Sequence, residues 1–189
     1  MRNYACLLAI VVLVSLVSCD AIKDATTVEI ETDLNIDIPV ATTIKSGSIL
    51  KSANAEIAVF QFGGNGTFSM ADNNDISDYI SNINDILLNG VSKIQIINVP
   101  TGGKISKFKL NYGINPDAGT TGVNITTELT AINGIIEITD VAWINQLLTL
   151  VKQNKKSTYK FVVSGDASYD IQSTLKIKIP VIIEASPLK

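Results

Sequence analysis

The chain has 189 residues and a formal net charge of −3, and it contains no histidine, 2 cysteines (Cys6 and Cys19) and a single arginine, Arg2. The absence of histidine removes the usual general base, the Ser-His-Asp arrangement and the commonest ligand of zinc, copper and iron, and beyond Cys19 no thiol remains for catalysis, metal binding or a disulfide. The chain is weakly acidic and its cations beyond Arg2 are all lysines, a combination that suits neither bidentate phosphate recognition nor nucleic-acid binding.

An apolar run follows Arg2 and ends at Cys19. A positive start, an apolar stretch of about fourteen residues and small residues at its end are typical of a secretory signal peptide, whereas crossing a bilayer takes about twenty apolar residues. The run closes with Leu16-Val17-Ser18-Cys19, which resembles the lipobox of bacterial lipoproteins. The resemblance implies that residues 1–18 are a removed signal peptide and that the Cys19 thiol and the new amino terminus are acylated. Two or three acyl chains hold a protein firmly at a membrane, so residues 19–27 should be a lipidated tether.

Acidic residues follow the lipobox at Asp20 and Asp24. In some Gram-negative bacteria an aspartate after the lipidated cysteine marks retention at the inner membrane, and in others acidic residues there accompany export to the cell surface. Both rules fit this sequence. We favour the outer membrane, on its periplasmic or its surface face, over the inner membrane.

Alternating apolar and acidic positions over Val28–Ile38 predict a half-buried strand with an acidic outer face. Its phrase Leu34–Val40 returns as Leu175–Val181, with the same apolar positions and with lysines in place of the acidic or amide residues. Opposite charges across a strand pair contribute about 0.2–1 kcal/mol each, so we expect the first and last strands to share a sheet and to be candidates for neighbours in it. Pro39 and Pro180 cannot donate to a ladder, which predicts an edge or a bulge at each.

Alternation and turn residues predict the strands between these ends. A hairpin is expected from Ala53–Phe62 and Thr67–Met70 around the turn Gly63–Gly66. Further strands are expected at Val91–Val99, Ser106–Tyr112, Val123–Ala131, Ile135–Ile138 (after the Asn133-Gly134 turn), Tyr159–Val163 and from Ile171 to about Glu184.

Apolar residues at three- and four-residue spacing predict two amphipathic α-helices. The first opens at Asp72–Asp75 and continues through Leu87 to a stop at Gly90. The second is capped by Thr139 or Asp140 and has one apolar face: Val141, Ile144, Leu147, Leu148 and Val151. About eight strands with two inserted helices predict a single antiparallel β-sandwich domain over residues 28–189.

Oxygen-bearing side chains cluster at Asp72, Asn74, Asp75 and Asp78, and such oxygens are what Ca²⁺ prefers. The spacing does not match an EF-hand loop. Acidic residues in a first helical turn also satisfy free N–H groups and the helix dipole, which is the simpler interpretation. We expect neither a resident metal nor a cofactor, and these four residues are the candidate calcium ligands.

Two further kinds of site are conceivable. A pair of carboxylates at a separation of about 5–9.5 Å could hydrolyse glycosides, and aromatic rings could form a platform for sugars. Solvated turn acids and packed core rings are the alternative interpretations. The candidate acids are Asp117, Glu128, Asp140, Asp166 and Asp170, and the candidate rings are Tyr112, Trp143, Tyr159 and Tyr169.

The lipobox, the short tether and one histidine-free β domain resemble the small cell-envelope lipoproteins of Gram-negative bacteria. We therefore expect a protein anchored to a membrane through lipid on Cys19, whose domain binds a protein or glycan partner without catalysis. Two alternatives stay open. A carrier of an apolar ligand would need an internal cavity of about 300–1,000 Å³, and a hydrolase working with carboxylates alone would need two acids facing each other across a cleft.

Overall fold

The computed structural model describes residues 27–44, 50–52, 55–57 and 59–187, so the predicted leader, Cys19 and all of the tether but Thr27 lie outside the described residues. The described chain is mainly β. Its strands are β1 (Val28–Ile44), β2 (Leu50–Ser52), β3 (Ala55–Ile57), β4 (Phe60–Ser69), β5 (Ile83–Leu88), β6 (Lys93–Ile97), β7 (Lys104–Ile114), β8 (Thr121–Ile125), β9 (Leu129–Thr130), β10 (Ile136–Glu137), β11 (Thr158–Ala167) and β12 (Gln172–Ala185). Its helices are the 3₁₀ segments η1 (Met70–Asp72) and η2 (Ser77–Asn82) and the α-helix α2 (Ile144–Gln153).

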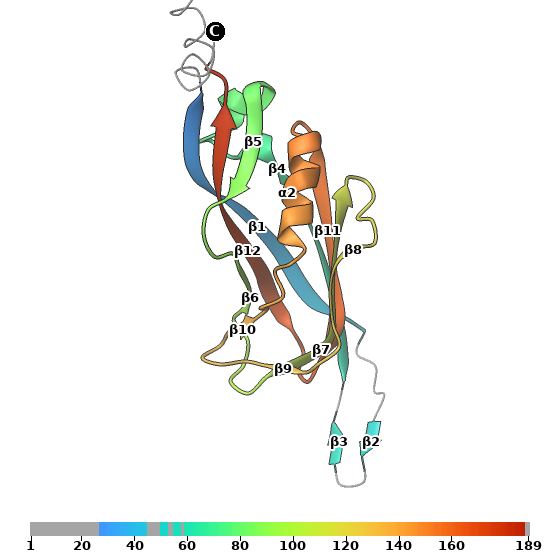
Figure 1. Ribbon diagram of the computed structural model, residues 1–189. Helices are drawn as coiled ribbons and strands as arrows, with labels where there is room; N and C mark the ends of the chain where they lie inside the picture. The colour runs from blue at the N-terminus through green and yellow to red at the C-terminus, as the bar shows by residue number, and fades with distance from the viewer. Residues whose placement is uncertain (1–26, 45–49, 53–54, 58, 188–189) are drawn as a thin grey trace, which may run out of the picture.

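Ten of these strands form one antiparallel sheet that curls into a half-barrel (Figure 1). Its order is β10-β6-β12-β1-β4-β11-β7-β8, with β5 also paired to β12 and β9 also paired to β7, while β2 and β3 form a separate two-stranded sheet. The antiparallel β class is confirmed. The sandwich is not confirmed, because these ten strands are hydrogen-bonded into one sheet and do not divide into two packed ones.

The first and last strands lie side by side, as their charge patterns predict. β1 and β12 pair from Val28 opposite Ala185 to Ala41 opposite Gln172. Two ion pairs cross this ladder on its outer face: Lys178 Nζ lies 2.7 Å from Asp33 Oδ2, and Lys176 Nζ lies 3.4 Å from Asp37 Oδ2. The two lysines of β12 therefore neutralise two of the four acids of β1, Asp33 and Asp37.

Pro39 and Pro180 each lie where the ladder is interrupted on one side of their strand. β1 pairs with β4 only from Val40 onward, directly after Pro39. β12 pairs with β6 up to Lys178 and with β5 from Val181, so Pro180 lies in the gap between the two partners. A missing N–H costs least at such positions, which explains why proline is tolerated inside two long strands.

The predicted hairpin around Gly63–Gly66 is wrong, because the glycines lie inside the continuous strand β4, which pairs with β11 over its whole length. These glycines allow a close approach of β1. A Cβ placed on Gly64 would overlap the carbonyl oxygen of Pro39, and one on Gly66 would lie 3.0 Å from Cγ1 of Ile38. Glycine in a strand interior commonly marks such a backbone contact.

The first predicted α-helix is also partly wrong. The segment is helical up to Asn82, but as the short 3₁₀ segments η1 and η2, and Ile83–Leu88 then forms β5. Ile83 and Ile86 are buried as predicted, but in a strand that pairs with β12. Isoleucine suits a strand better than a helix. The pairing of this segment with β12, which is distant in sequence, makes it a strand.

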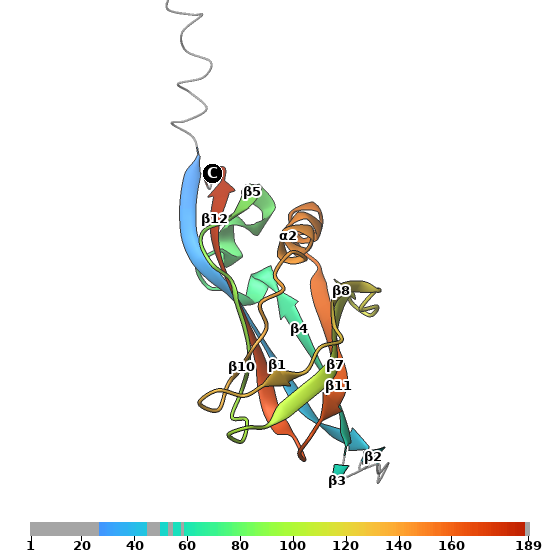
Figure 2. The same cartoon turned by 60° about the horizontal axis from the view of Figure 1, so that its bottom comes forward.

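The second predicted helix is confirmed as α2. It covers the open, concave side of the curled sheet (Figures 1 and 2), and Ile144, Leu147, Leu148 and Val151 are buried there. Val141, expected on the same face, precedes the helix and is exposed. Asp140 does not cap α2; its carboxylate accepts the N–H of Ala142 in the preceding turn, at 3.3 Å. No helix in the described part of the chain is long and apolar enough to cross a membrane.

Candidate functional site

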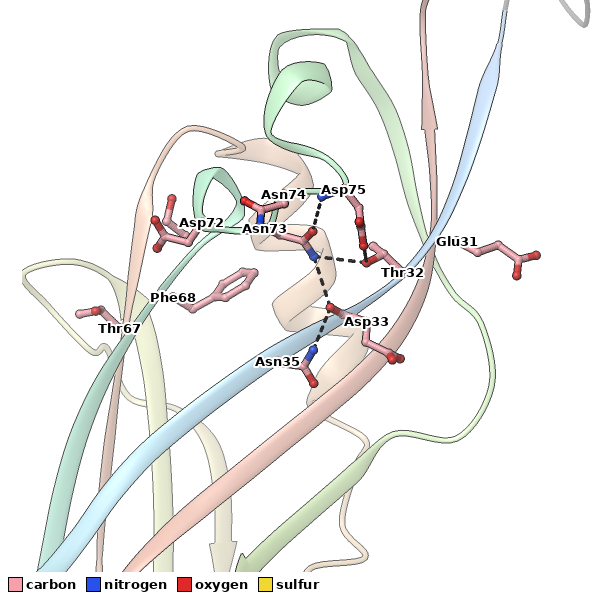
Figure 3. Close-up of a pocket in the computed structure, with 11 residues that line it drawn as sticks. Glu31, Thr32, Asp33, Asn35, Thr67, Phe68, Asp72, Asn73, Asn74 and Asp75 are labelled. Carbon is pink, nitrogen blue, oxygen red and sulfur yellow. Dashed lines mark hydrogen bonds between the residues drawn. The ribbon is translucent and has the colours of Figure 1, made fainter.

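A groove of about 640 Å³ opens between the N-terminal part of β1 and the last residues of β4 (Figure 3). The two strands pair only between Val40 and Ile44 of β1, so they are free to diverge on the side of Val28. η1 and the loop after it border the gap. The lining residues are Glu31, Thr32, Asp33, Asn35, Thr67, Phe68, Ser69, Asp72, Asn73, Asn74 and Asp75.

Asn73 ties the loop to the open edge of β1. Its side-chain amide donates to the Thr32 hydroxyl and to the Asp33 carbonyl oxygen, each at 3.3 Å, and its Oδ1 accepts the N–H of Asp75 at 2.9 Å. The Thr32 hydroxyl in turn donates to Asp75 Oδ2 at 2.7 Å, as Figure 3 shows. This network holds one wall of the groove in place, and a polar network of this kind stabilises most when its members are mutually satisfied.

Hydrogen-bond acceptors dominate the surface of the groove. Asp33 is paired with Lys178, and Asp75 accepts from Thr32, so both have partners within the fold. Asp72, the last residue of η1, and Asn74, in the loop after it, are exposed. Phe68 projects between the two walls in Figure 3, although it is only 7% exposed because its ring packs against Tyr159, with ring centroids 6.3 Å apart. A ligand that fits this groove must bring hydrogen-bond donors.

The structure brings three of the four candidate calcium ligands into this groove. Asp72, Asn74 and Asp75 line it, whereas Asp78 lies in η2 and is not among its lining residues. Across the residues that the structure describes, no three His, Cys, Asp or Glu side chains lie close enough together to hold a metal ion. Asp72, Asp75 and Asp78 therefore do not form a carboxylate cluster.

Three of the five candidate catalytic acids have separate partners. Glu128 pairs with Lys104 at 2.6 Å and Asp166 with Lys107 at 2.8 Å, while Asp140 accepts a backbone N–H. Asp117 and Asp170 lie between strands. The two ion pairs involve different lysines, so they give no indication that two of these acids share one site.

The aromatic platform is wrong for three of its four rings. Tyr112, Trp143 and Tyr159 are 3%, 4% and 0% exposed and belong to the core. The Tyr112 and Trp143 rings are in contact, with centroids 5.3 Å apart, and the Tyr159 hydroxyl donates to the Asn154 carbonyl oxygen at 2.6 Å. Burial raises the pKa of Tyr159 and of the half-buried Tyr169 to about 12. The buried rings of Tyr112, Trp143 and Tyr159 therefore stabilise the fold.

Thr32, Phe68 and Asn73 contribute to the groove, yet nothing in the sequence singles them out. Thr32 is one inward position of an alternating strand, and Phe68 follows the glycine cluster as an ordinary apolar residue. Asn73 lies beside the acidic residues that suggest calcium. Its amide bonds to the edge of β1, and this role can be recognised only when that edge is known to lack a partner among the described strands.

Comparisons of the chain with protein-family models, with curated proteins and with solved structures found no match.

Proposed function

We propose that this protein is a lipid-anchored envelope protein of a Gram-negative bacterium, held at the outer membrane through acyl chains on Cys19. Its β domain binds a glycan without catalysis, in the groove between β1 and β4. The observation that carries the anchor is the sequence Leu16-Val17-Ser18-Cys19 at the end of an apolar run of leader length. The observation that carries the binding role is the acceptor-rich groove.

The arrangement of the chain ends agrees with an anchored domain. Val28 and Ala185 are paired, and both lie at one end of the elongated domain, opposite β2 and β3 (Figures 1 and 2). The nine residues 19–27 can span at most about 30 Å. A domain tethered in this way stays close to the bilayer, with its termini toward the membrane and the β2–β3 end away from it.

The groove favours a glycan because sugar hydroxyls donate hydrogen bonds, and carboxylate and amide oxygens accept them. Asp72 at the end of η1 and Asn74 in the following loop are exposed, and Thr67 adds an exposed hydroxyl on β4, the strand that leads into η1 (Figure 3). Hydrogen bonds to charged groups contribute about 1.5–3 kcal/mol each, so two or three of them are enough for specific recognition.

The two alternatives gain less support. A hydrolase needs two acids that face each other, whereas Glu128 and Asp166 are held by separate lysines. A carrier of an apolar ligand needs a hollow interior, whereas α2 and the apolar side chains of the sheet pack into one core on the concave side. Non-catalytic binding at the surface remains the function that the geometry favours.

Metabolic labelling with a palmitate analogue tests the anchor. We expect the wild-type protein to carry the label and the Cys19→Ala variant to lose it. Added protease on intact cells then separates the two faces of the outer membrane: cleavage of the domain indicates the surface face and protection indicates the periplasmic face. A wild-type protein without label would refute the anchor.

A glycan array probed with the purified protein tests the binding role. We expect binding of the wild type to at least one glycan class, and at least a tenfold loss in the double variant Asp72→Asn/Asn74→Ala. Glu137→Gln is the matched control, because Glu137 is an exposed acid on β10 and not part of the groove. Unchanged binding by the double variant would exclude the groove, and no binding by the wild type would refute a glycan partner.

A further inference from the structure

A second groove, of about 540 Å³, lies between β5 and α2. Its volume is in the range of ligand sites, about 300–1,000 Å³. Among the described strands β5 pairs with β12 alone, so its other edge is free of a strand and lies toward α2 (Figure 1). An unpaired edge offers backbone N–H and C=O groups to an incoming strand.

The hydrogen bonds around β5 show which backbone groups face this groove. Just beyond the strand, the Asn89 N–H donates to the Pro180 carbonyl oxygen on β12 at 2.8 Å. The Ile86 N–H instead donates to the carboxylate of Asp85 at 2.7 Å and so points away from β12. Backbone groups of an antiparallel strand alternate between its two sides, so those of Ile86 and Leu88 are on the groove side. The alternation does not extend to Asn84, because the register with β12 shifts between Asp85 and Ile83.

The chain's own carboxylate occupies this edge. Asp85 accepts from the Ile86 N–H and is also paired with Lys152 of α2, whose Nζ lies 2.8 Å from it. The hydrogen bond from Lys152 holds the pKa of Asp85 below its usual value. Asp85 therefore takes the position that an acceptor from an added strand would take.

The remaining lining gives the chemistry of a partner. Leu87 and Leu88 are 45% and 42% exposed. Large apolar side chains exposed on an edge strand favour association with another chain. Lys152 and Lys155 from the side of α2 outnumber the single acid, Asp85, in a chain that is acidic as a whole. The groove is thus complementary to an extended segment with aliphatic and acidic side chains.

We propose that the groove between β5 and α2 binds an extended, acidic segment of a partner protein, which adds to β5 as a further strand. Main-chain hydrogen bonds to Ile86 and Leu88 would supply affinity, as in other cases of strand addition, and Lys152 would select acidic side chains. Binding requires that the Asp85 carboxylate leave the Ile86 N–H, so Asp85 competes with the partner. This site is separate from the glycan groove and does not depend on it.

A second copy of the chain fits this edge less well. Antiparallel pairing of β5 with β5 of another copy relates the two by a twofold axis perpendicular to the sheet. Because the strands run along the long axis of the domain, such a pair would point the two chain ends in opposite directions (Figure 1). Two copies tethered to one membrane could not pair in this way, a conclusion that rests on the lipid anchor proposed above.

Fluorescence anisotropy with the purified full chain tests the proposal. The probe is a labelled, end-capped octapeptide of alternating valine and glutamate, and the matched control replaces each glutamate by lysine. We expect the acidic peptide to bind at least tenfold more tightly than the basic one. Lys152→Ala should weaken its binding at least fivefold, while Lys93→Ala, which changes an exposed lysine on β6, should leave it unchanged.

The Asp85→Ala variant shows whether this edge of β5 binds the peptide or whether its residues only support the fold. Because this variant frees both the Ile86 N–H and Lys152, we expect tighter binding of the acidic peptide, by at least threefold, whereas a loss of structure would weaken binding. Equal binding of the two peptides, binding of neither, or weaker binding by Asp85→Ala would overturn the proposal. A wild-type dimer in sedimentation that Leu87→Asp dissociates would identify a second copy as the occupant and would also overturn it.

Discussion

The crossing of β1 and β4 depends on a glycine, and Gly64→Ala tests it. A Cβ on Gly64 would overlap the Pro39 carbonyl oxygen and would lie 2.9 Å from Cγ1 of Val40, so β1 and β4 must separate. Added atoms in a well-packed site cost about 1–3 kcal/mol, and the contact with rigid backbone puts this site at the upper end. Alanine also lowers the entropy of the unfolded chain, which offsets about 0.4–1 kcal/mol. We expect a net loss of about 2 kcal/mol in the free energy of unfolding.

Urea unfolding of the purified protein, followed by the fluorescence of the buried Trp143, measures this loss. With a slope of about 2 kcal/mol/M, the midpoint should fall by about 1 M. Gly63→Ala is the matched control, because a Cβ there has its nearest neighbours at 3.4 Å, and neither glycine has a positive φ. The control should be neutral or slightly stabilised. Equal midpoints for the two variants would show that β1 does not cross β4 at Gly64.

Three further predictions concern polar groups. Asp85 has a lowered pKa in the folded state, so its pairing with Lys152 stabilises the protein above the ordinary aspartate pKa of about 3.9 and the benefit is lost as the pH falls through the lowered value. Asp85→Asn should therefore lower the thermal midpoint at pH 7 and lose its effect in strong acid; a difference that grows in acid would contradict this. Burial raises the pKa of Tyr159 to about 12, so its neutral form stabilises the fold below about pH 10 and that contribution is lost as the pH rises through 12. Tyr159→Phe should cost about 1 kcal/mol at pH 7 in urea unfolding, through its lost hydrogen bond, and should flatten the alkaline decline in stability. A double-mutant cycle on Asp33 and Lys178 should give a coupling of about 0.2–1 kcal/mol that falls with added salt, and no coupling at low salt would show that the ion pair does not support the β1–β12 ladder.

The elements that could be predicted from the sequence are those whose signal is complete within the segment or within a matched pair of segments. α2 follows from the spacing of its apolar residues. The turn at Asn133-Gly134 follows from its residues and has positive φ at both, 52° and 80°. The neighbours β1 and β12 follow from opposite charges on two copies of one apolar phrase, and the register places Asp37 opposite Lys176.

The elements that could not be predicted depend on contacts between distant segments. Glycine suits both a turn and a close backbone crossing, and only the position of Pro39 shows that Gly64 serves the second purpose. Ile83 and Ile86 fit a helical face as well as a strand, and the free edge of β12 beyond Val181 decides for the strand. The groove between β1 and β4 also depends on contacts between distant segments. Asp72, Asn74 and Asp75 carry a local signal as an oxygen-rich cluster, whereas Thr32, Phe68 and Asn73 carry none.

Both grooves follow from the repeated Ile-Pro-Val phrase. At Pro39 the ladder between β1 and β4 stops, so toward the chain ends the two strands diverge and the polar groove opens. At Pro180 β12 exchanges β6 for β5 in the same direction, which leaves β5 with a free edge beside α2. If Pro39 and Pro180 ended their strands, the sheet would also end at these two residues. Because β1 and β12 stay paired with each other past both prolines, the sheet instead divides around this pair of strands. Both surface grooves lie on the side of the prolines toward Val28 and Ala185.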